Sequence, residues 1–272
     1  MALVPSRDTK CRTKKTKRRK NKHNVLFEAC NDFKIMQNLN YIYDHDDTDD
    51  ENIINVGKII PRNENQELYL KYLKDSSNQI IFSTGAAGVG KTYLSLVHAI
   101  QEVFEYKNYK KILITRPIVT VSNESLGYLK GSMNDKMDPY MQPLYDILEK
   151  YISKEDLKYY ISEKIIEICP LGFIRGRTFE DCIILIDESQ NSTVEQMKAL
   201  LTRIGIGSKL LITGDTGQSD LNKYNNGLLD FVNRYKKNDN LNKDFIRLVE
   251  FKNEDIVRNP IIKTILDMYD NN

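Results

Sequence analysis

Eight consecutive residues, 85–92, read G-A-A-G-V-G-K-T and match the phosphate-loop pattern G-x-x-x-x-G-K-T. The glycines allow successive backbone N–H groups to turn inward toward the phosphates of a nucleotide. Lys91 can then reach the β- and γ-phosphates, and the hydroxyl of Thr92 can coordinate Mg²⁺. The predicted nucleotide-binding residues are Gly85, Ala86, Ala87, Gly88, Val89, Gly90, Lys91 and Thr92.

An acidic pair, Asp187 and Glu188, ends an apolar run about 95 residues after the phosphate loop. In an open parallel sheet, ligands bind at the carboxyl ends of the strands, so this pair would face the nucleotide. Asp187 would hold Mg²⁺, directly or through water, and Glu188 would polarise the attacking water. The pair alone leaves open the alternative that it caps a following helix.

A third polar segment, 213–218, follows another apolar run and reads T-G-D-T-G-Q. A polar side chain at this point can sense the γ-phosphate or position the attacking water. We predict this role for Gln218. The alternative is a glycine-rich turn whose polar groups are incidental.

Apolar patterns around these residues predict the elements that must position them. The phosphate loop lies between a β-branched apolar run and a segment with apolar residues at helical spacing, the context of a functional phosphate loop. We predict strands over 79–83, 111–115, 165–168, 182–186 and 209–213. We predict helices over 66–74, 92–104, 143–152, 154–163 and from 194 to Gly205, the last opened by a capping box over 192–195.

This alternation of apolar strands and helices indicates an α/β fold. Near-continuous apolar strands are typical of a parallel sheet that helices cover on both faces. Segment 118–145 has polar turns and little clear periodicity, so no helix is predicted in it before residue 143.

The composition excludes several classes of protein. Of the 272 residues, 40% are apolar, which is enough for a sizeable core, but no apolar stretch approaches the roughly 18 residues of a membrane span. The basic N-terminus lacks the apolar segment of a secretory signal. The four cysteines show no C-x-x-C pairing, and the three histidines are too scattered for a metal site. We expect a reduced, cytoplasmic protein that has no membrane partner.

The net charge of +2 conceals a strong asymmetry. Residues 1–24 contain ten Lys or Arg and one acid, so they carry +9 while the remainder carries −7. Such a run repels itself and buries nothing, and it predicts a disordered arm that contacts nucleic acid or directs the chain to a nucleus. A solubilising tail, or one that folds back on the acidic run 44–51, is the alternative. Residues 25–58 then form an acidic linker or auxiliary segment, and 59–272 form the main domain.

Several further motifs make the chain resemble the PhoH family of phosphate-loop ATPases over roughly residues 60–270. Besides the phosphate loop, these motifs are 115–117, 126–131, 138–146, 170–179, 187–191, 201–205, 213–215 and 256–260. That family is similar to the first motor domain of superfamily 1 helicases, which implies a RecA-like phosphate-loop NTPase fold with a single motor domain. The resemblance also implies that Gln66 reads adenine, that 187–190 is motif II, and that Gly214, Asp215 and Gln218 form motif III.

The sequence does not identify which arginine would act in catalysis. The 57 residues after Asp215 are too few for a second motor-sized domain, which supplies the arginine in two-domain helicases. We therefore expect it in cis or from a neighbouring chain of a ring, and the resemblance points to hexamers. Arg258 is the preferred cis candidate, and Arg175, Arg177 and Arg203 are the others.

Three function classes remain open for a chain with these motifs. The first is hydrolysis of ATP with Mg²⁺, coupled to binding or unwinding RNA or single-stranded DNA, with Arg116, Tyr128 and Lys130 in the nucleic-acid channel. The second is a nucleotide-gated nucleic-acid-binding protein with little turnover. The third is a phosphate-loop kinase, which is disfavoured because a kinase activates a substrate hydroxyl and needs no Asp-Glu pair to activate water.

Overall fold

The computed structural model describes residues 54–117, 133–174, 176–218, 225–238, 243–257 and 268, and for residues 133–139 it describes the backbone alone. By its contacts the chain divides into residues 1–51 and 52–272, and every described residue belongs to the second unit. The predicted arm, 1–24, and most of the linker, 25–58, therefore lie outside the described residues.

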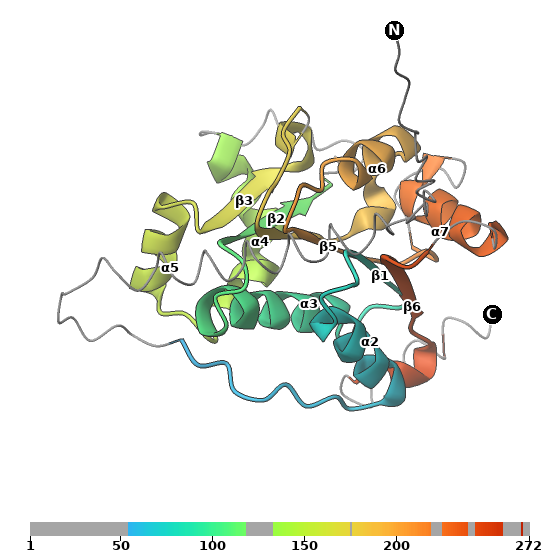
Figure 1. Cartoon of the computed structure of the whole chain (residues 1–272), viewed down its shortest axis with the longest axis horizontal. Coiled ribbons are helices and arrows are strands. Elements are labelled where there is room, and N and C mark those ends of the chain that lie inside the picture. The colour runs from blue at the N-terminus through green and yellow to red at the C-terminus, as the bar shows by residue number, and fades with distance from the viewer. Residues whose placement is uncertain are drawn as a thin grey trace, which may run out of the picture. The chain divides into compact units, whose positions relative to one another are not determined.

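A six-stranded sheet forms the centre of the second unit, in the order β3-β2-β4-β5-β1-β6 (Figure 1). Each neighbouring pair of these strands is parallel. The strands are β1 (Ile80–Thr84), β2 (Lys111–Arg116), β3 (Ile166–Pro170), β4 (Cys182–Ile186), β5 (Lys209–Gly214) and β6 (Ile246–Glu250). The central strand β4 is buried along its whole length, as the apolar run predicts for a strand covered on both faces.

Helices cover the two faces of this sheet. They are α2 (Glu64–Lys74), α3 (Lys91–Ile100), α4 (Met133–Leu148), α5 (Lys154–Ser162), α6 (Val194–Leu201) and α7 (Gly227–Lys237). A π-helical turn, Gln101–Glu105, extends α3, and short 3₁₀ turns cover Leu171–Ile174, Ser189–Asn191 and Asn253–Asp255. Helices α2 and α3 lie on the face opposite to α6 and α7 (Figure 1). The predicted α/β class, a parallel sheet with helices on both faces, is confirmed.

Alternating side chains of the strands divide the interior into two cores. On β2, Ile112 and Ile114 pack in the core formed with α2 to α5, whereas Leu113 belongs to the core formed with α6 and α7. Full burial of one such aliphatic side chain contributes about 1.5–3 kcal/mol. The two cores pack against opposite faces of the sheet and hold its strands in place. The carboxyl ends of the strands therefore keep fixed positions relative to one another.

Two helix predictions are corrected by the structure. Helix α4 begins at Met133, ten residues before the predicted start at 143, and its sequence contains Pro139 and Pro143. Proline inside a helix removes a backbone donor and breaks the expected pattern, so the sequence alone placed the start too late. Helix α6 also ends at Leu201, before the predicted stop at Gly205.

The capping box that opens α6 lies one residue later than the sequence analysis placed it. Thr193 is the N-cap residue, and its hydroxyl accepts a bond of 3.2 Å from the backbone N–H of Gln196. The side chain of Gln196 in turn accepts from the backbone N–H of Thr193 at 2.8 Å. Ser192 instead donates its hydroxyl to the carbonyl of Ser189, so it belongs to the preceding turn.

Two elements, α7 and β6, were not predicted. Asn226 caps α7 by accepting from the backbone N–H of Leu229 at 3.0 Å, and the helix packs Leu228 and Val232 into the core beside α6. Strand β6 pairs with β1 and completes one edge of the sheet. No helix within the described ranges is both long and apolar enough to cross a membrane.

Candidate nucleotide-binding site

The carboxyl ends of four neighbouring strands converge at one edge of the sheet. Thr84 of β1 lies opposite Gly214 of β5, and Ile186 of β4 lies opposite Thr115 of β2. The last residues of these strands and the segments that follow them carry the phosphate loop, the acidic pair, the segment 213–218 and Arg116. Chain topology thus gathers the predicted site residues, which are up to about 130 positions apart in the sequence, at the edge where parallel sheets bind ligands.

The phosphate loop has a backbone that requires glycine. Gly85, Gly88 and Gly90 have φ values of 137°, 93° and 90°. A Cβ atom on Gly85 would lie 2.4 Å from the carbonyl oxygen of Phe251, so any side chain there would displace the segment after β6. The loop leads directly into α3, whose first residue is Lys91. The N–H groups of the loop and the positive end of the helix dipole therefore lie together, an arrangement that favours a bound anion.

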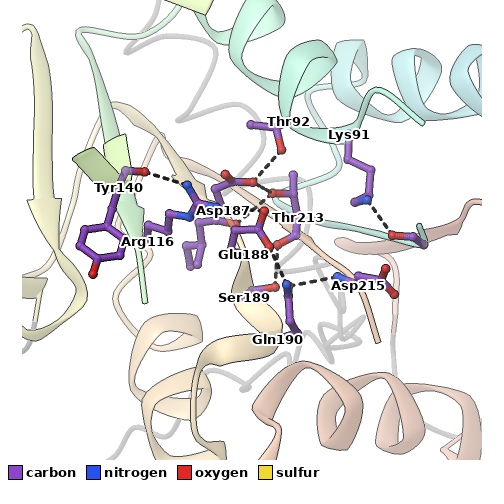
Figure 2. Close-up of polar contacts among 12 residues, drawn as sticks. Lys91, Thr92, Arg116, Tyr140, Asp187, Glu188, Ser189, Gln190, Thr213 and Asp215 are labelled. Atoms are coloured by element: carbon purple, nitrogen blue, oxygen red, sulfur yellow. Dashed lines mark hydrogen bonds and ion pairs between the residues drawn. The ribbon is translucent and has the colours of Figure 1, made fainter. Parts of the chain in front are cut away.

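Lys91 reaches back across the loop. Its ammonium group donates to the carbonyl oxygens of Gly85 at 2.7 Å and Ala86 at 2.9 Å, and the side chain is buried (Figure 2). This arrangement holds a positive charge at the mouth of the loop. A phosphate group in the loop would meet that charge directly.

Oxygen atoms suited to Mg²⁺ meet beside the loop (Figure 2). The hydroxyl of Thr92 donates to Oδ1 of Asp187 at 2.6 Å, and the hydroxyl of Thr213 donates to the same oxygen at 2.6 Å. No group of three or more His, Cys, Asp or Glu that could hold a metal by itself occurs among the described residues. Mg²⁺ commonly takes one or two protein oxygens, substrate phosphates and water, so the pair Thr92 and Asp187 fits this ion.

Glu188 is held on both of its carboxylate oxygens. Arg116 at the end of β2 places Nη2 3.0 Å from Oε1, and Gln190 donates from Nε2 to Oε2 at 2.5 Å. Glu188 itself has φ = 52°, a left-handed conformation that few non-glycine residues adopt. Arg116 also donates from Nη1 to the backbone carbonyl of Tyr140 in α4 at 2.7 Å.

These groups line one cavity of about 440 Å³. Its walls include Lys91, Thr92, Arg116, Asp187 and Glu188, and an exposed Gln218 lies on its rim with Gly214 and Asp215. Arg116 is the one arginine that lines this cavity within the described part of the chain. The predicted catalytic side chains Lys91, Glu188 and Gln218 therefore face a common space.

A larger cavity of about 810 Å³ adjoins the first and shares Gly88, Gly90 and Tyr93 with it. Gln66 lies in its wall and is buried. The side-chain amide of Gln66 donates to the carbonyl of Val89 at 3.0 Å and accepts from the backbone N–H of Arg62 at 2.9 Å. Each end of an amide can make one further hydrogen bond, so Gln66 can support the loop and still pair with a base.

Other predicted residues lie elsewhere. Arg177 forms a two-bond ion pair with Glu167 of β3, and Arg203 donates to the carbonyl of Ala199 near the end of α6. Neither lines the two cavities. Arg258, the preferred catalytic arginine, lies outside the described residues, as do Arg175, Tyr128 and Lys130.

The structure adds three residues that the sequence analysis did not assign to the site. Thr213 bonds Asp187, Gln190 bonds Glu188, and Tyr93 lines both cavities. Gln190 was visible as part of the 187–190 motif, and Thr213 as the last polar residue of an apolar strand. Nothing in the sequence indicated that Tyr93 belongs to the site. Its hydroxyl is hydrogen-bonded to that of Tyr151, which follows α4, and only the folded chain brings the two residues together.

A parallel sheet with a phosphate loop after β1 and an Asp-Glu pair after β4 defines a phosphate-loop NTPase with a RecA-like fold. Comparison with known proteins narrows this class. The family model described as PhoH-like protein matches residues 58–270. The chain belongs to the PhoH family.

Individual relatives agree with this assignment. A PhoH-like protein of Bacillus subtilis is 42% identical over 193 residues, covering 71% of this chain and 59% of the relative. Protein PhoH of Escherichia coli K12 is 36% identical over 214 residues, covering 78% of this chain and 58% of the relative. The chain thus spans less than two thirds of the length of these relatives.

Among solved structures, the Sulfolobus solfataricus SWI2/SNF2 ATPase core in complex with dsDNA aligns with 72% of this chain and 45% of its own. The identity is 15% and the TM-score is 0.41.

Proposed function

We propose that this protein hydrolyses ATP with Mg²⁺. The observation that carries the proposal is that Lys91, Thr92, Asp187 and Glu188, from two separate segments, line one cavity of about 440 Å³. A loop that binds phosphate, two oxygens suited to a metal and a carboxylate able to act on water are the parts that phosphoryl transfer to water requires.

Each residue has a defined task in this proposal. Lys91 turns its ammonium from the loop carbonyls to the β- and γ-phosphates, and the glycine-rich backbone donates its N–H groups to them. Thr92 and Asp187 would hold Mg²⁺, which draws charge from the β- and γ-oxygens when it is bound. Glu188 accepts a proton from the attacking water, and Gln218 orients that water or senses the γ-phosphate.

The larger cavity fits the adenosine half of ATP. It shares Gly88 and Gly90 with the smaller cavity, is not lined by the acidic pair, and is lined by Gln66, Tyr93 and Val257. In this proposal Gln66 reads adenine with the amide donor and acceptor that its contacts to Val89 and Arg62 leave over. The aromatic ring of Tyr93 provides an apolar wall at the boundary between base and phosphates.

We further propose that hydrolysis is coupled to RNA or single-stranded DNA, with unwinding as its strongest form, in the cytoplasm. The basic arm 1–24 would hold the polynucleotide without sequence preference, and Tyr128 and Lys130 would line its path. A ring, hexameric by the family resemblance, would supply a catalytic arginine from a neighbouring chain unless Arg258 supplies it in cis.

A phosphate-release assay with purified protein, ATP and Mg²⁺ tests the proposal, with and without poly(U) RNA. Turnover that RNA stimulates supports a nucleic-acid-coupled ATPase. Tight ATP binding without turnover would instead indicate a nucleotide-gated binding protein. Turnover that appears only when a small-molecule acceptor is added would indicate a kinase.

Two variations of this assay address the arm and the ring. Deleting residues 1–24 should flatten the dependence of RNA affinity on salt, by about 0.7 in the log–log slope for each lost phosphate contact. If the site is shared between chains, the rate per chain rises steeply with protein concentration. A concentration-independent rate from a monomer would contradict the ring and favour Arg258 in cis.

A further inference from the structure

Glu188, the proposed base, has a hydrogen-bond donor on each carboxylate oxygen. Arg116 approaches Oε1 at 3.0 Å, and Gln190 donates to Oε2 at 2.5 Å. A general base must direct a lone pair at the proton that it removes, within hydrogen-bond distance. A carboxylate offers roughly four lone-pair sites, and these two donors take one on each oxygen, so the guanidinium of Arg116 competes with water for Oε1 (Figure 2).

We propose that Arg116 is a positioning residue that restrains Glu188, and that the rate of hydrolysis rises when the guanidinium releases the carboxylate. This inference rests on the proposed function, since it assigns to Glu188 the task of activating water. It differs from the sequence expectation, which placed Arg116 in a nucleic-acid channel.

The strength of the restraint follows from the chemistry of the pair. An arginine–carboxylate contact is charge-assisted and stronger than a bond from a neutral amide. The side chains of Arg116 and Glu188 are 22% and 38% exposed, so the pair is neither locked inside the protein nor fully screened by water. Such a pair can hold the carboxylate in the resting state and still exchange partners.

Arg116 also connects Glu188 to α4. Its Nη1 atom donates to the carbonyl of Tyr140 at 2.7 Å while Nη2 holds Glu188, so one guanidinium joins β2, α4 and the segment after β4. Helix α4 packs Met141 and Leu144 into the same core as α3, the helix that begins with Lys91. A shift of α4 would therefore move the arginine relative to both the base and the phosphate loop.

The second contact of Glu188 provides the alternative position. Gln190 accepts from the backbone N–H of Asp215 at 3.0 Å through its amide oxygen while its amide nitrogen holds Glu188. This amide ties the carboxylate to the end of β5, close to the segment of Gln218. Once Arg116 is withdrawn, Gln190 keeps one oxygen oriented and leaves the other free for water.

The backbone at Glu188 is consistent with two arrangements. Its φ of 52° is a sparsely populated conformation for a residue with a side chain, and such residues concentrate at active sites and switches. Only Asp187 separates Glu188 from strand β4, and Glu188 directly precedes a 3₁₀ turn of three residues, Ser189–Asn191. A short turn between fixed elements can change the direction of one side chain without moving the sheet.

The test is the steady-state rate of the variant Arg116→Ala. We expect kcat to rise by about two- to fivefold, the range that a partly exposed charged pair can hold, with little change in the KM for ATP. Arg116→Gln, which keeps a polar side chain at the position, should show the same direction and covers the case in which the alanine variant does not fold. Arg116→Lys should lie between, because an ammonium can pair with Glu188 but cannot bridge it to Tyr140 as a planar fork.

Controls separate release of the base from other effects. Arg234→Ala removes an arginine that pairs with Asp230 on α7, away from both cavities, and should leave kcat unchanged. Adding Glu188→Gln to Arg116→Ala should abolish the gain, since the arginine acts through that carboxylate. Persistence of the gain in the double variant would overturn the assignment.

The inference and the proposed function can fail separately. If the wild-type protein hydrolyses ATP while Arg116→Ala and Arg116→Gln are equally fast or slower, the restraint is wrong and the ATPase stands. If the wild-type protein is inactive and the Arg116 variants hydrolyse ATP, the restraint is supported in its strongest form. Inactivity of all of them would overturn both.

Discussion

Two arginine–glutamate pairs each have one member in the sheet, Glu167 in β3 and Arg116 in β2, and they differ in how many contacts join the two side chains. Arg177 binds Glu167 of β3 through two parallel contacts of 2.5 and 2.9 Å, and its guanidinium lies 4.6 Å from the ring centre of Phe179. Arg116 meets Glu188 through one contact of 3.0 Å from Nη2, and its Nη1 donates to the backbone carbonyl of Tyr140. The first pair is complete, whereas the second is divided among several partners.

The surroundings of the two carboxylates explain the difference. The hydrogen bond from Arg177 holds the pKa of Glu167 below its usual range, and Lys111 adds a further positive charge at 3.7 Å. Glu188 instead lines the cavity beside the phosphate loop and stands in a left-handed backbone conformation. Glu167 is thus held by two cationic side chains, whereas Glu188, the proposed base, has one arginine and one neutral amide as partners and borders a cavity.

The largest expected effect is on kcat when Glu188 is replaced, and the same replacement of Glu167 is its control. Glu188→Gln should lower kcat by about 10²-fold or more while ATP still binds, because the amide cannot accept the proton of water. Glu167→Gln should leave kcat unchanged. Single-turnover hydrolysis measures the rate of the chemical step, and binding of a fluorescent nucleotide measures the affinity. Wild-type turnover in Glu188→Gln would show that another group activates the water.

A smaller effect is expected at the opposite end of the nucleotide site. Gln66→Ala should weaken ATP binding by about tenfold, the worth of one or two hydrogen bonds to a base, and should change GTP binding little. Titrations with both nucleotides measure this difference. Because Gln66 also supports Val89, equal losses for ATP and GTP would assign it to the loop and not to the base.

The response to RNA sharpens the comparison between the two arginines. If polynucleotide binding acts by drawing Arg116 away from Glu188, poly(U) should stimulate the wild-type protein by about two- to fivefold, the expected worth of the pair. It should then stimulate Arg116→Ala scarcely at all, and Arg177→Ala as much as wild type. Equal stimulation of wild type and Arg116→Ala would separate RNA coupling from this pair.

The smallest expected effect is on stability. Arg177→Ala should lower the free energy of unfolding by about 1 kcal/mol at neutral pH, since the pair is partly exposed to solvent. The folded pKa of Glu167 is lowered, so this contribution is present above the ordinary glutamate value of about 4.3 and is lost as the pH falls through the folded value. Urea unfolding at pH 7 and at pH 3 should therefore show a difference between wild type and variant that shrinks in acid.

Much of the fold could be predicted because the signals are local. The strand 182–186 agrees with the structure at both ends, and the predicted α/β class follows from apolar runs that alternate with helical spacing. The start predicted for α4 was ten residues too late and the capping box was displaced by one, because prolines and adjacent hydroxyl residues each permit more than one local pattern. Strand β6 was not predicted, because it is defined by its pairing with β1, a contact between distant segments that no local pattern shows.

By itself the sequence determined the phosphate loop, the acidic pair and the order of strands and helices around them, because each is a short pattern whose spacing expresses backbone geometry. The tertiary structure decided which side chains meet: that Arg116 pairs with Glu188, that Gln190 joins it to Asp215, and that Arg177 is committed to Glu167. The partners in each ion pair come from different segments of the chain, and an arginine's charge is the same in every context. The folded sheet fixes which strand ends are neighbours. It thereby pairs Arg177 with Glu167 of β3 and places Arg116 against Glu188, the proposed base.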